Sequence, residues 1–190
     1  MRTSERRFSL FLQASVVLLG AVQSFMWRNM MDADGMSYVD VAYTYLRGDW
    51  PGAVNGYWSP LYSWMIAALL AVFDPSPAAE FPLIQALDFF CFLLSLGTFT
   101  YFVRQLFARF ADEGVESGRS FGRAWLVLAY AAFAYASIAL QDVGRGGPDF
   151  LLAACFYLAS GLLLRIENSP VASLPLMAGL GLSLGIGYLA

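Results

Sequence analysis

The stretch DADGMSYVDVAYTYLRGDWPGAVNGYWSP, residues 32–60, is the only long segment of this 190-residue chain that is not mostly apolar. It has one basic residue, Arg47, and four carboxylates: Asp32, Asp34, Asp40 and Asp49. Carboxylates near a bilayer are costly unless they face water, a metal ion or a substrate. Because apolar segments flank it on both sides, we interpret this acidic stretch (residues 32–60) as the working face of a membrane enzyme.

Composition indicates an integral membrane protein and excludes several kinds of chemistry. Hydrophobic residues make up 59% of the chain and charged residues only 13%, about half the usual charged share of a soluble domain. The net charge of -3 argues against nucleic acid as a partner. The sequence contains neither His nor Lys, which excludes His-based zinc sites, a Ser-His-Asp triad and a Schiff-base lysine. Cys91 and Cys155 lie in apolar runs and are expected to be buried, inert thiols.

Hydropathy predicts five membrane crossings, at residues 8–27, 81–103, 124–140, 150–164 and 171–190. A cleaved signal peptide is the alternative for the first, but the run is long for a signal and VQSFMW offers no small-x-small cleavage site. Residues 61–73 are apolar but reach only about 20 Å as a helix, short of a hydrocarbon core of about 30 Å.

The distribution of arginine predicts the topology. The basic N-terminus, Arg165 and the cluster from Arg104 to Arg123 should all be cytoplasmic. This cluster runs from the end of the crossing 81–103 through a polar loop at residues 111–123. Three apolar segments separate the N-terminus from this cluster, so one does not cross, and the short segment 61–73 is the candidate for an interfacial helix. The acidic stretch and QDVGRGGPD, residues 141–149 (the glycine loop), then share the outer face.

These observations predict an all-α fold, a multi-pass transmembrane helical bundle with juxtamembrane amphipathic helices near residues 35–47 and 61–73. In the first, the apolar residues Met36, Val39, Tyr43 and Leu46 recur at helical spacing. Four glycines near the C-terminal end predict a close approach between membrane helices. The chain ends at Ala190 without a polar tail, so we expect it to be the N-terminal part of a larger protein, with partners for this last helix outside the chain.

Asp32 and Asp34 form an Asp-x-Asp pair just before the predicted amphipathic helix. Asp34 alone is explained equally well as a helix N-cap. That explanation leaves Asp32 unaccounted for, since a second acid would repel the first. Such a pair suits a divalent cation, Mg²⁺ or Mn²⁺, or a base that receives a proton from a hydroxyl or amine.

The wider pattern resembles a known family. It comprises Asp34, Tyr38 and Asp40, then GDW (48–50), NGY (55–57) and SPLY (59–62) with Trp64. This is similar to the first outer loop of GT-C fold glycosyltransferases that use polyprenyl-phosphate sugars (glycosyltransferase family 39), such as the lipid A aminoarabinose transferase and the protein O-mannosyltransferases. The resemblance covers about residues 32–165 and includes the order of the segments.

The resemblance implies roles for particular residues. Asp34 corresponds to the catalytic carboxylate and Asp149 to the acid of the second outer loop. Substrate or phosphate binding would fall to Tyr38, Ser59, Asp142, Arg145 and Arg28. There are two departures, because Gly35 replaces a Glu and Ser59 stands where the lipid A enzyme has a phosphate-binding Lys. Phosphate neutralisation would then come from Arg145, Arg28, a metal ion or a part of the protein beyond this chain.

The implied function is transfer of a sugar from a polyprenyl-phosphate donor to a lipid, glycan or protein acceptor, at the outer face of a bacterial inner membrane, with the N-terminus cytoplasmic. The alternatives are a transporter or flippase for lipid-linked sugars and a non-catalytic assembly protein. Other roles stay open too. Asp149 can be an N-cap in a solvated turn, and Asp88 can be structural or functional. Five residues can form an interfacial aromatic belt or stack on a ligand: Trp50, Tyr57, Trp58, Tyr62 and Trp64.

Overall fold

The structure is a computed structural model that describes residues 3–112, 119–169 and 173–190, and the only regular elements in these ranges are helices. They are α1 (Thr3–Trp27), α2 (Ala33–Leu46), α3 (Trp50–Ala53), α4 (Pro60–Phe73), α5 (Pro77–Asp112), α6 (Arg119–Ala134), the π-helix η1 (Tyr135–Leu140), α7 (Asp149–Glu167) and α8 (Leu174–Leu189). The predicted all-α fold is confirmed.

Four helical segments of the described chain are long and apolar enough to cross a membrane: Arg6–Trp27, Pro77–Phe110, Gly122–Leu140 and Asp149–Glu167. They match four of the predicted crossings, and the chain is a membrane protein. The fifth prediction, residues 171–190, falls on α8, which has 16 residues and is among the shorter apolar helices. Its start at 171–172 lies outside the described residues. That α8 crosses, and that α4 does not, remain predictions.

Helix α5 is much longer than the predicted segment 81–103. Its 36 residues span about 54 Å at 1.5 Å per residue, well beyond a hydrocarbon core of about 30 Å. Polar residues after Val103 end the apolar run, but no Gly or Pro lies between Val103 and Asp112, so the helix continues to Asp112. The predicted polar loop at 111–123 is therefore shorter, since α6 already begins at Arg119. Residues 113–118 lie outside the described residues.

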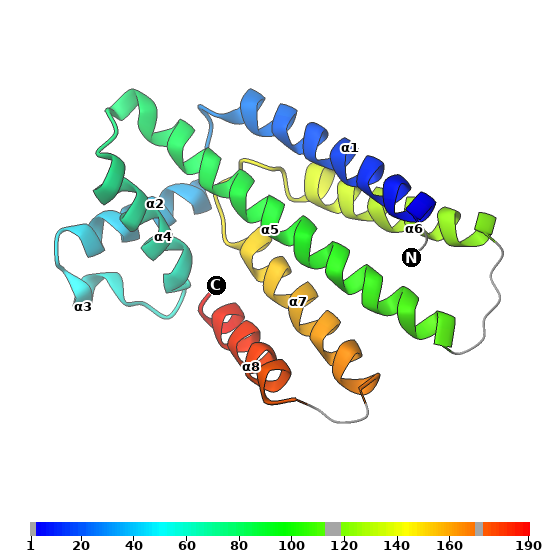
Figure 1. The fold of residues 1–190 in the computed structure, drawn as a ribbon. Helices are drawn as coiled ribbons and strands as arrows, with labels where there is room; N and C mark the ends of the chain where they lie inside the picture. The colour runs from blue at the N-terminus through cyan, green and yellow to red at the C-terminus, as the bar shows by residue number, and fades with distance from the viewer. Residues whose placement is uncertain (1–2, 113–118, 170–172) are drawn as a thin grey trace.

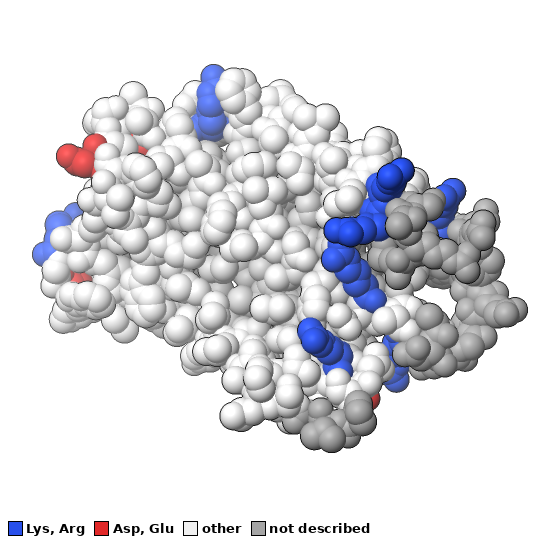
Figure 2. Space-filling model, in the orientation of Figure 1, with Lys and Arg blue, Asp and Glu red and all other residues white. Residues whose placement is uncertain are grey.

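The long helices α1, α5, α6 and α7 run lengthwise beside one another, and α2, α3 and α4 gather at one end of them (Figure 1). The α1–α2 linker and the glycine loop lie at this same end, which we call the α2–α4 end. Most basic side chains on the face in Figure 2 lie towards the opposite end, where α5 finishes and α6 begins. This separation fits the arginine argument, while the side of the membrane that each end faces remains a prediction.

Helix α2 packs against α4 with a different face from the one expected. Its buried residues are Gly35, Tyr38, Val39, Ala42 and Tyr45, whereas Met36 and Leu46 are exposed. The tyrosines are buried because their rings meet α4 edge-on, with centroids 5.3 Å apart for Tyr38–Tyr62 and 6.1 Å for Tyr45–Trp64. Such edge-to-face pairs stabilise by about 0.5–1.5 kcal/mol beyond their buried area.

Small residues allow close helix approach at α7. A Cβ on Gly161 would lie 2.7 Å from the Tyr101 ring of α5, so α5 and α7 meet where only glycine fits. On α8, a Cβ on Gly187 would lie 3.1 Å from Cys155 of α7, while nothing among the described atoms lies within 4 Å of one on Gly181 or Gly185. Part of the predicted glycine surface is thus used inside the chain.

Candidate functional site

The candidate site is a cavity of about 170 Å³ at the α2–α4 end. Since a buried water needs only about 15 Å³, the space exceeds that of a single water molecule. Its lining comprises Asp32, Asp34, Tyr38, Trp58, Asp88, Gln141, Asp142, Arg145, Gly146, Gly147, Pro148, Asp149 and Phe150. Six of the predicted catalytic, binding or metal-ligating residues meet there: Asp32, Asp34, Tyr38, Asp142, Arg145 and Asp149.

Asp32, not Asp34, is the N-cap of α2. Asp32 Oδ1 accepts a hydrogen bond of 2.7 Å from the Gly35 N–H, and Oδ2 lies 3.3 Å from Arg145 Nε. The Asp32 N–H also donates to the Arg145 carbonyl at 3.3 Å. Asp32 therefore caps a helix and fastens the acidic stretch to the glycine loop at the same time.

Asp34 lies in the first turn of α2 and is exposed. Its carboxylate makes no hydrogen bond or ion pair with another described residue, so the capping explanation for Asp34 is wrong. Asp34 is thus an unengaged carboxyl group on the cavity wall.

Asp149 is the first residue of α7, and Pro148 occupies the N-cap position without a side-chain hydrogen bond. Capping therefore does not explain Asp149 either. Its side chain is exposed and lines the cavity from the end of the glycine loop. It approaches α2 closely enough to act electrostatically on Tyr38.

Tyr38 stands between these acids and is only 7% exposed. Burial raises the pKa of its hydroxyl above the usual value, and the negative charges of Asp149 and Asp34 raise it further. The phenol consequently keeps its proton at neutral pH and can donate a hydrogen bond towards the cavity.

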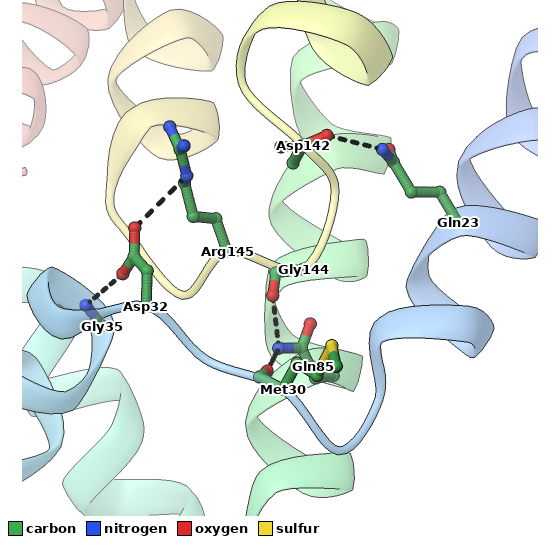
Figure 3. A network of polar contacts seen from close by, with 8 residues as sticks. All are labelled: Gln23, Met30, Asp32, Gly35, Gln85, Asp142, Gly144 and Arg145. Atoms are coloured by element: carbon green, nitrogen blue, oxygen red, sulfur yellow. Dashed lines mark hydrogen bonds and ion pairs between the residues drawn. The ribbon is translucent and has the colours of Figure 1, made fainter.

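Two amide side chains, those of Gln23 and Gln85, hold the backbone of the glycine loop (Figure 3). Three of its residues have positive φ angles, 59° at Asp142, 119° at Gly144 and 84° at Gly146. Gln23 of α1 donates to Asp142 Oδ1 at 2.8 Å and accepts from the Val143 N–H at 2.9 Å. Gln85 of α5 donates to the Gly144 carbonyl. Gly144 and Gly146 adopt these φ values without a Cβ penalty, and the two glutamines pair the buried Val143 N–H and Gly144 carbonyl.

Asp88 of α5 lies at the inner side of the cavity and is 2% exposed. Its Oδ1 accepts a hydrogen bond from the Tyr62 hydroxyl, and Oδ2 has no hydrogen-bond partner among the described residues. Tyr62 is fully buried, so its assignment to an interfacial aromatic belt is wrong: it packs inward because its hydroxyl meets a buried carboxyl group. Trp50, Tyr57 and Trp64 are exposed, and Trp58 lines the cavity.

Two predicted phosphate-binding residues are not brought to the cavity. Arg28 follows the last residue of α1, where its guanidinium lies 4.1 Å from the centroid of the Phe25 ring and donates to the Phe25 carbonyl at 2.6 Å. Ser59 is the N-cap residue of α4, without a side-chain capping bond. Arg145 is the one basic residue of the cavity lining.

A metal ion is not readily accommodated by the Asp-x-Asp pair alone. Both carboxylate oxygens of Asp32 are engaged, one by the Gly35 N–H and one by Arg145. In the described ranges, no three Asp, Glu, Cys or His side chains come together as ligands. The Mg²⁺ or Mn²⁺ site proposed at Asp32 and Asp34 stays a prediction.

Three polar residues of the cavity lining or its supports were not singled out from the sequence: Gln23, Gln85 and Gln141. A signal existed for Gln85, because it precedes Asp88 by three residues and would share its face of an apolar helix. Gln23 gave a weaker signal as an amide near the end of an apolar run. The partners of both glutamines lie far away in the sequence, so neither contact follows from local pattern.

Five carboxyl groups and a single guanidinium surround the cavity. Such a lining favours ligands rich in hydrogen-bond donors, such as hydroxyl groups or amines. Arg145, whose side chain is 55% exposed, is the one positive charge in this lining that can attract an anion. No protein-family model matches the chain, and the searches of curated proteins and of solved structures give no match either.

Proposed function

We propose that this chain is part of a membrane glycosyltransferase that moves a sugar from a polyprenyl-phosphate carrier to an acceptor outside the cytoplasm. One observation carries the proposal: Asp34, Asp149 and Arg145, from two distant segments, line one cavity at the end of a membrane helix bundle. The family resemblance arose from residues in these same segments. A lipid-linked donor could enter such a site from the bilayer, with its sugar beyond the hydrocarbon core.

In this reaction Asp34 acts as the general base. The acceptor oxygen or nitrogen attacks the anomeric carbon of the sugar and gives its proton to the Asp34 carboxylate. A positioned base contributes about 10²–10⁴ to such a rate. Asp34 suits this task because it lines the cavity and makes no hydrogen bond or ion pair with another described residue.

The leaving group is the polyprenyl phosphate, which takes the electron pair of the broken bond between the anomeric carbon and oxygen. Attack from the opposite side inverts the configuration at that carbon. Arg145 is the residue of the cavity that can neutralise the phosphate, because Asp32 engages its Nε while its Nη atoms have no partner among the described residues. A guanidinium is well suited to bidentate phosphate contacts.

The sugar occupies the acid-lined part of the cavity. Asp149 and Asp142 accept hydrogen bonds from its hydroxyl or amino groups, and the protonated Tyr38 donates one. Trp58 offers an aromatic face at the same cavity. Its edge-on contact with Tyr38, at a centroid distance of 4.9 Å, fixes the ring. The acceptor, a lipid, glycan or protein, approaches from the aqueous side.

Donor turnover by the full-length protein in proteoliposomes tests the proposal. Decaprenyl phosphate carrying radiolabelled mannose, glucose or 4-amino-4-deoxyarabinose is supplied with an envelope extract as the source of acceptor. Free decaprenyl phosphate and a labelled product should appear together with one of the donors. A transporter would instead move intact donor between leaflets without releasing decaprenyl phosphate, and that result would contradict the proposal.

A further inference from the structure

We infer that Gln85 is a positioning residue that holds the acidic stretch and the glycine loop in the register that the cavity requires. The consequence for sugar transfer rests on the proposed function, whereas the positional claim does not. Gln85 lies on α5, outside both segments, and does not line the cavity.

The side-chain amide of Gln85 joins two distant parts of the chain (Figure 3). Nε2 donates to the Met30 carbonyl at 2.7 Å and also to the Gly144 carbonyl. Met30 precedes Asp32 by two residues, and Gly144 directly precedes Arg145. One NH₂ group thus holds the backbone near Asp32 and the backbone next to Arg145, the two partners of the ion pair.

Because Gln85 is buried, losing its hydrogen bonds should destabilise the contact between the two segments. Gln85 is 1% exposed; its bond to the Gly144 carbonyl is buried, and its bond to the Met30 carbonyl is partly buried. Losing the donor would leave the buried Gly144 carbonyl unpaired, which costs considerably more than exchanging an exposed bond. The segments would then have to shift towards other donors.

The glycine loop is fitted to this side chain. Gly144 has φ 119°, and a Cβ there would lie 2.5 Å from Gln85 Oε1. Neither the backbone conformation nor the space admits another residue. At Gly144 the loop backbone therefore packs directly against the Gln85 side chain of α5.

The substitution Gln85→Glu gives the sharpest test, because the two side chains have nearly the same shape. The introduced carboxyl group would present oxygen in place of the NH₂ group: ionised it donates neither bond, and protonated it donates only one, so at least one of the two carbonyls loses its donor. The matched control is Gln13→Glu. Gln13 Nε2 likewise makes two contacts, to Ser9 Oγ at 2.9 Å and Tyr130 Oη at 3.2 Å, away from the cavity.

The first measurement reports position without any assay of transfer. The substitutions D32C and R145C are introduced together in the full-length protein, and disulfide formation is followed after addition of an oxidant. Disulfides require a close approach of the two Cα atoms, which the backbone bond from Asp32 to Arg145 indicates. Mass spectrometry of the linked peptides separates this disulfide from any that involves Cys91 or Cys155.

The inference predicts rapid crosslinking in the parent and Gln13→Glu backgrounds, and about tenfold slower crosslinking with Gln85→Glu. Gly144→Ala, which disturbs the same contact from the loop side, should slow it similarly. Equal crosslinking in all backgrounds would overturn the inference. Gly144→Ala keeps the test decisive if Gln85→Glu does not fold, because it leaves α5 unchanged.

The second measurement is donor turnover, normalised to folded protein. Misplacing catalytic groups by about 1 Å can reduce turnover about 100-fold, so Gln85→Glu should lower kcat by about 10- to 100-fold with a smaller change in KM. Slower crosslinking with an unchanged kcat would overturn the catalytic part of the inference. If the parent turns over none of the donors, the proposed function fails, and crosslinking alone decides the positional claim.

Discussion

The Asp32 carboxylate lies 3.3 Å from Arg145 Nε and joins the acidic stretch to the glycine loop across most of the chain. The same carboxylate caps α2 through the Gly35 N–H. One side chain therefore sets the direction of α2 and the place of the only guanidinium in the cavity lining. Asp34, two residues further on, neither caps α2 nor forms a hydrogen bond or ion pair with another described residue.

Substitutions of Asp32 should separate its two roles. Asp32→Asn keeps a capping oxygen but removes the ion pair, which is partly exposed, and should cost at most about 1 kcal/mol of stability. Asp32→Ala removes the cap as well and should cost about 1–2 kcal/mol more. Thermal or denaturant unfolding in detergent checks the order. Equal losses for both variants would show that the cap contributes nothing measurable.

The buried Tyr62–Asp88 contact predicts a strong coupling in stability. Tyr62→Phe removes the one hydroxyl that satisfies Asp88 Oδ1 and should cost about 1–3 kcal/mol, because a buried carboxyl group loses its partner. In an Asp88→Leu background the same substitution should cost almost nothing. A double-mutant cycle from unfolding measurements supplies the coupling energy. Additive effects would mean that the two side chains do not depend on each other.

Gly35 provides a test of the close contact between α2 and the glycine loop. A Cβ there would lie 2.7 Å from the Gly146 carbonyl oxygen and 2.8 Å from that of Arg145. Gly35→Ala should therefore push the two segments apart and destabilise the protein by about 1–3 kcal/mol. Gly147→Ala is the matched control, because no described atom lies within 4 Å of its Cβ. Equal melting temperatures for the two variants would contradict the close approach.

Accessibility to an impermeant maleimide tests the topology. Cysteines at Gly56 and Gly147 belong to the two segments expected outside, and one at Gly122 belongs to the cytoplasmic end; none of the three positions is crowded. In sealed, right-side-out membranes only the first two should be labelled. Comparable labelling at Gly122 and Gly56 would place both ends on one side and remove the proposed orientation of the site.

Composition and periodicity were sufficient for the helical class and for four of the membrane segments, because lipid requires long apolar helices and no other element was compatible with such runs. Helix ends were less predictable. Helix α5 continues past Val103 because arginines end an apolar run without ending a helix. The buried face of α2 was misassigned because Tyr38 and Tyr45 pack inward as aromatic partners of α4, which the hydrophobic pattern of α2 alone does not reveal.

Most of the cavity lining could be predicted from the sequence, because acidic residues are few in a membrane protein and usually mark functional positions. The residues that support the cavity could not be predicted in this way. Gln23, Gln85 and the Tyr62–Asp88 pair depend on contacts between segments that are distant in sequence. The distinction between Asp32 as the cap and Asp34 as the free carboxylate depends on where α2 begins, which local propensity does not fix to the residue.

The role of Asp34 is tested most directly by the rate of sugar transfer in Asp34→Asn, measured with the full-length protein. The substitution keeps the size of the side chain and removes its charge and basicity. Because Asp34 does not cap α2, stability should change little, and the transfer rate should fall about 10²–10⁴-fold. Asp40→Asn, on the exposed side of the same helix, should transfer sugar at nearly the parent rate. Parent-like transfer by folded Asp34→Asn would contradict the central claim.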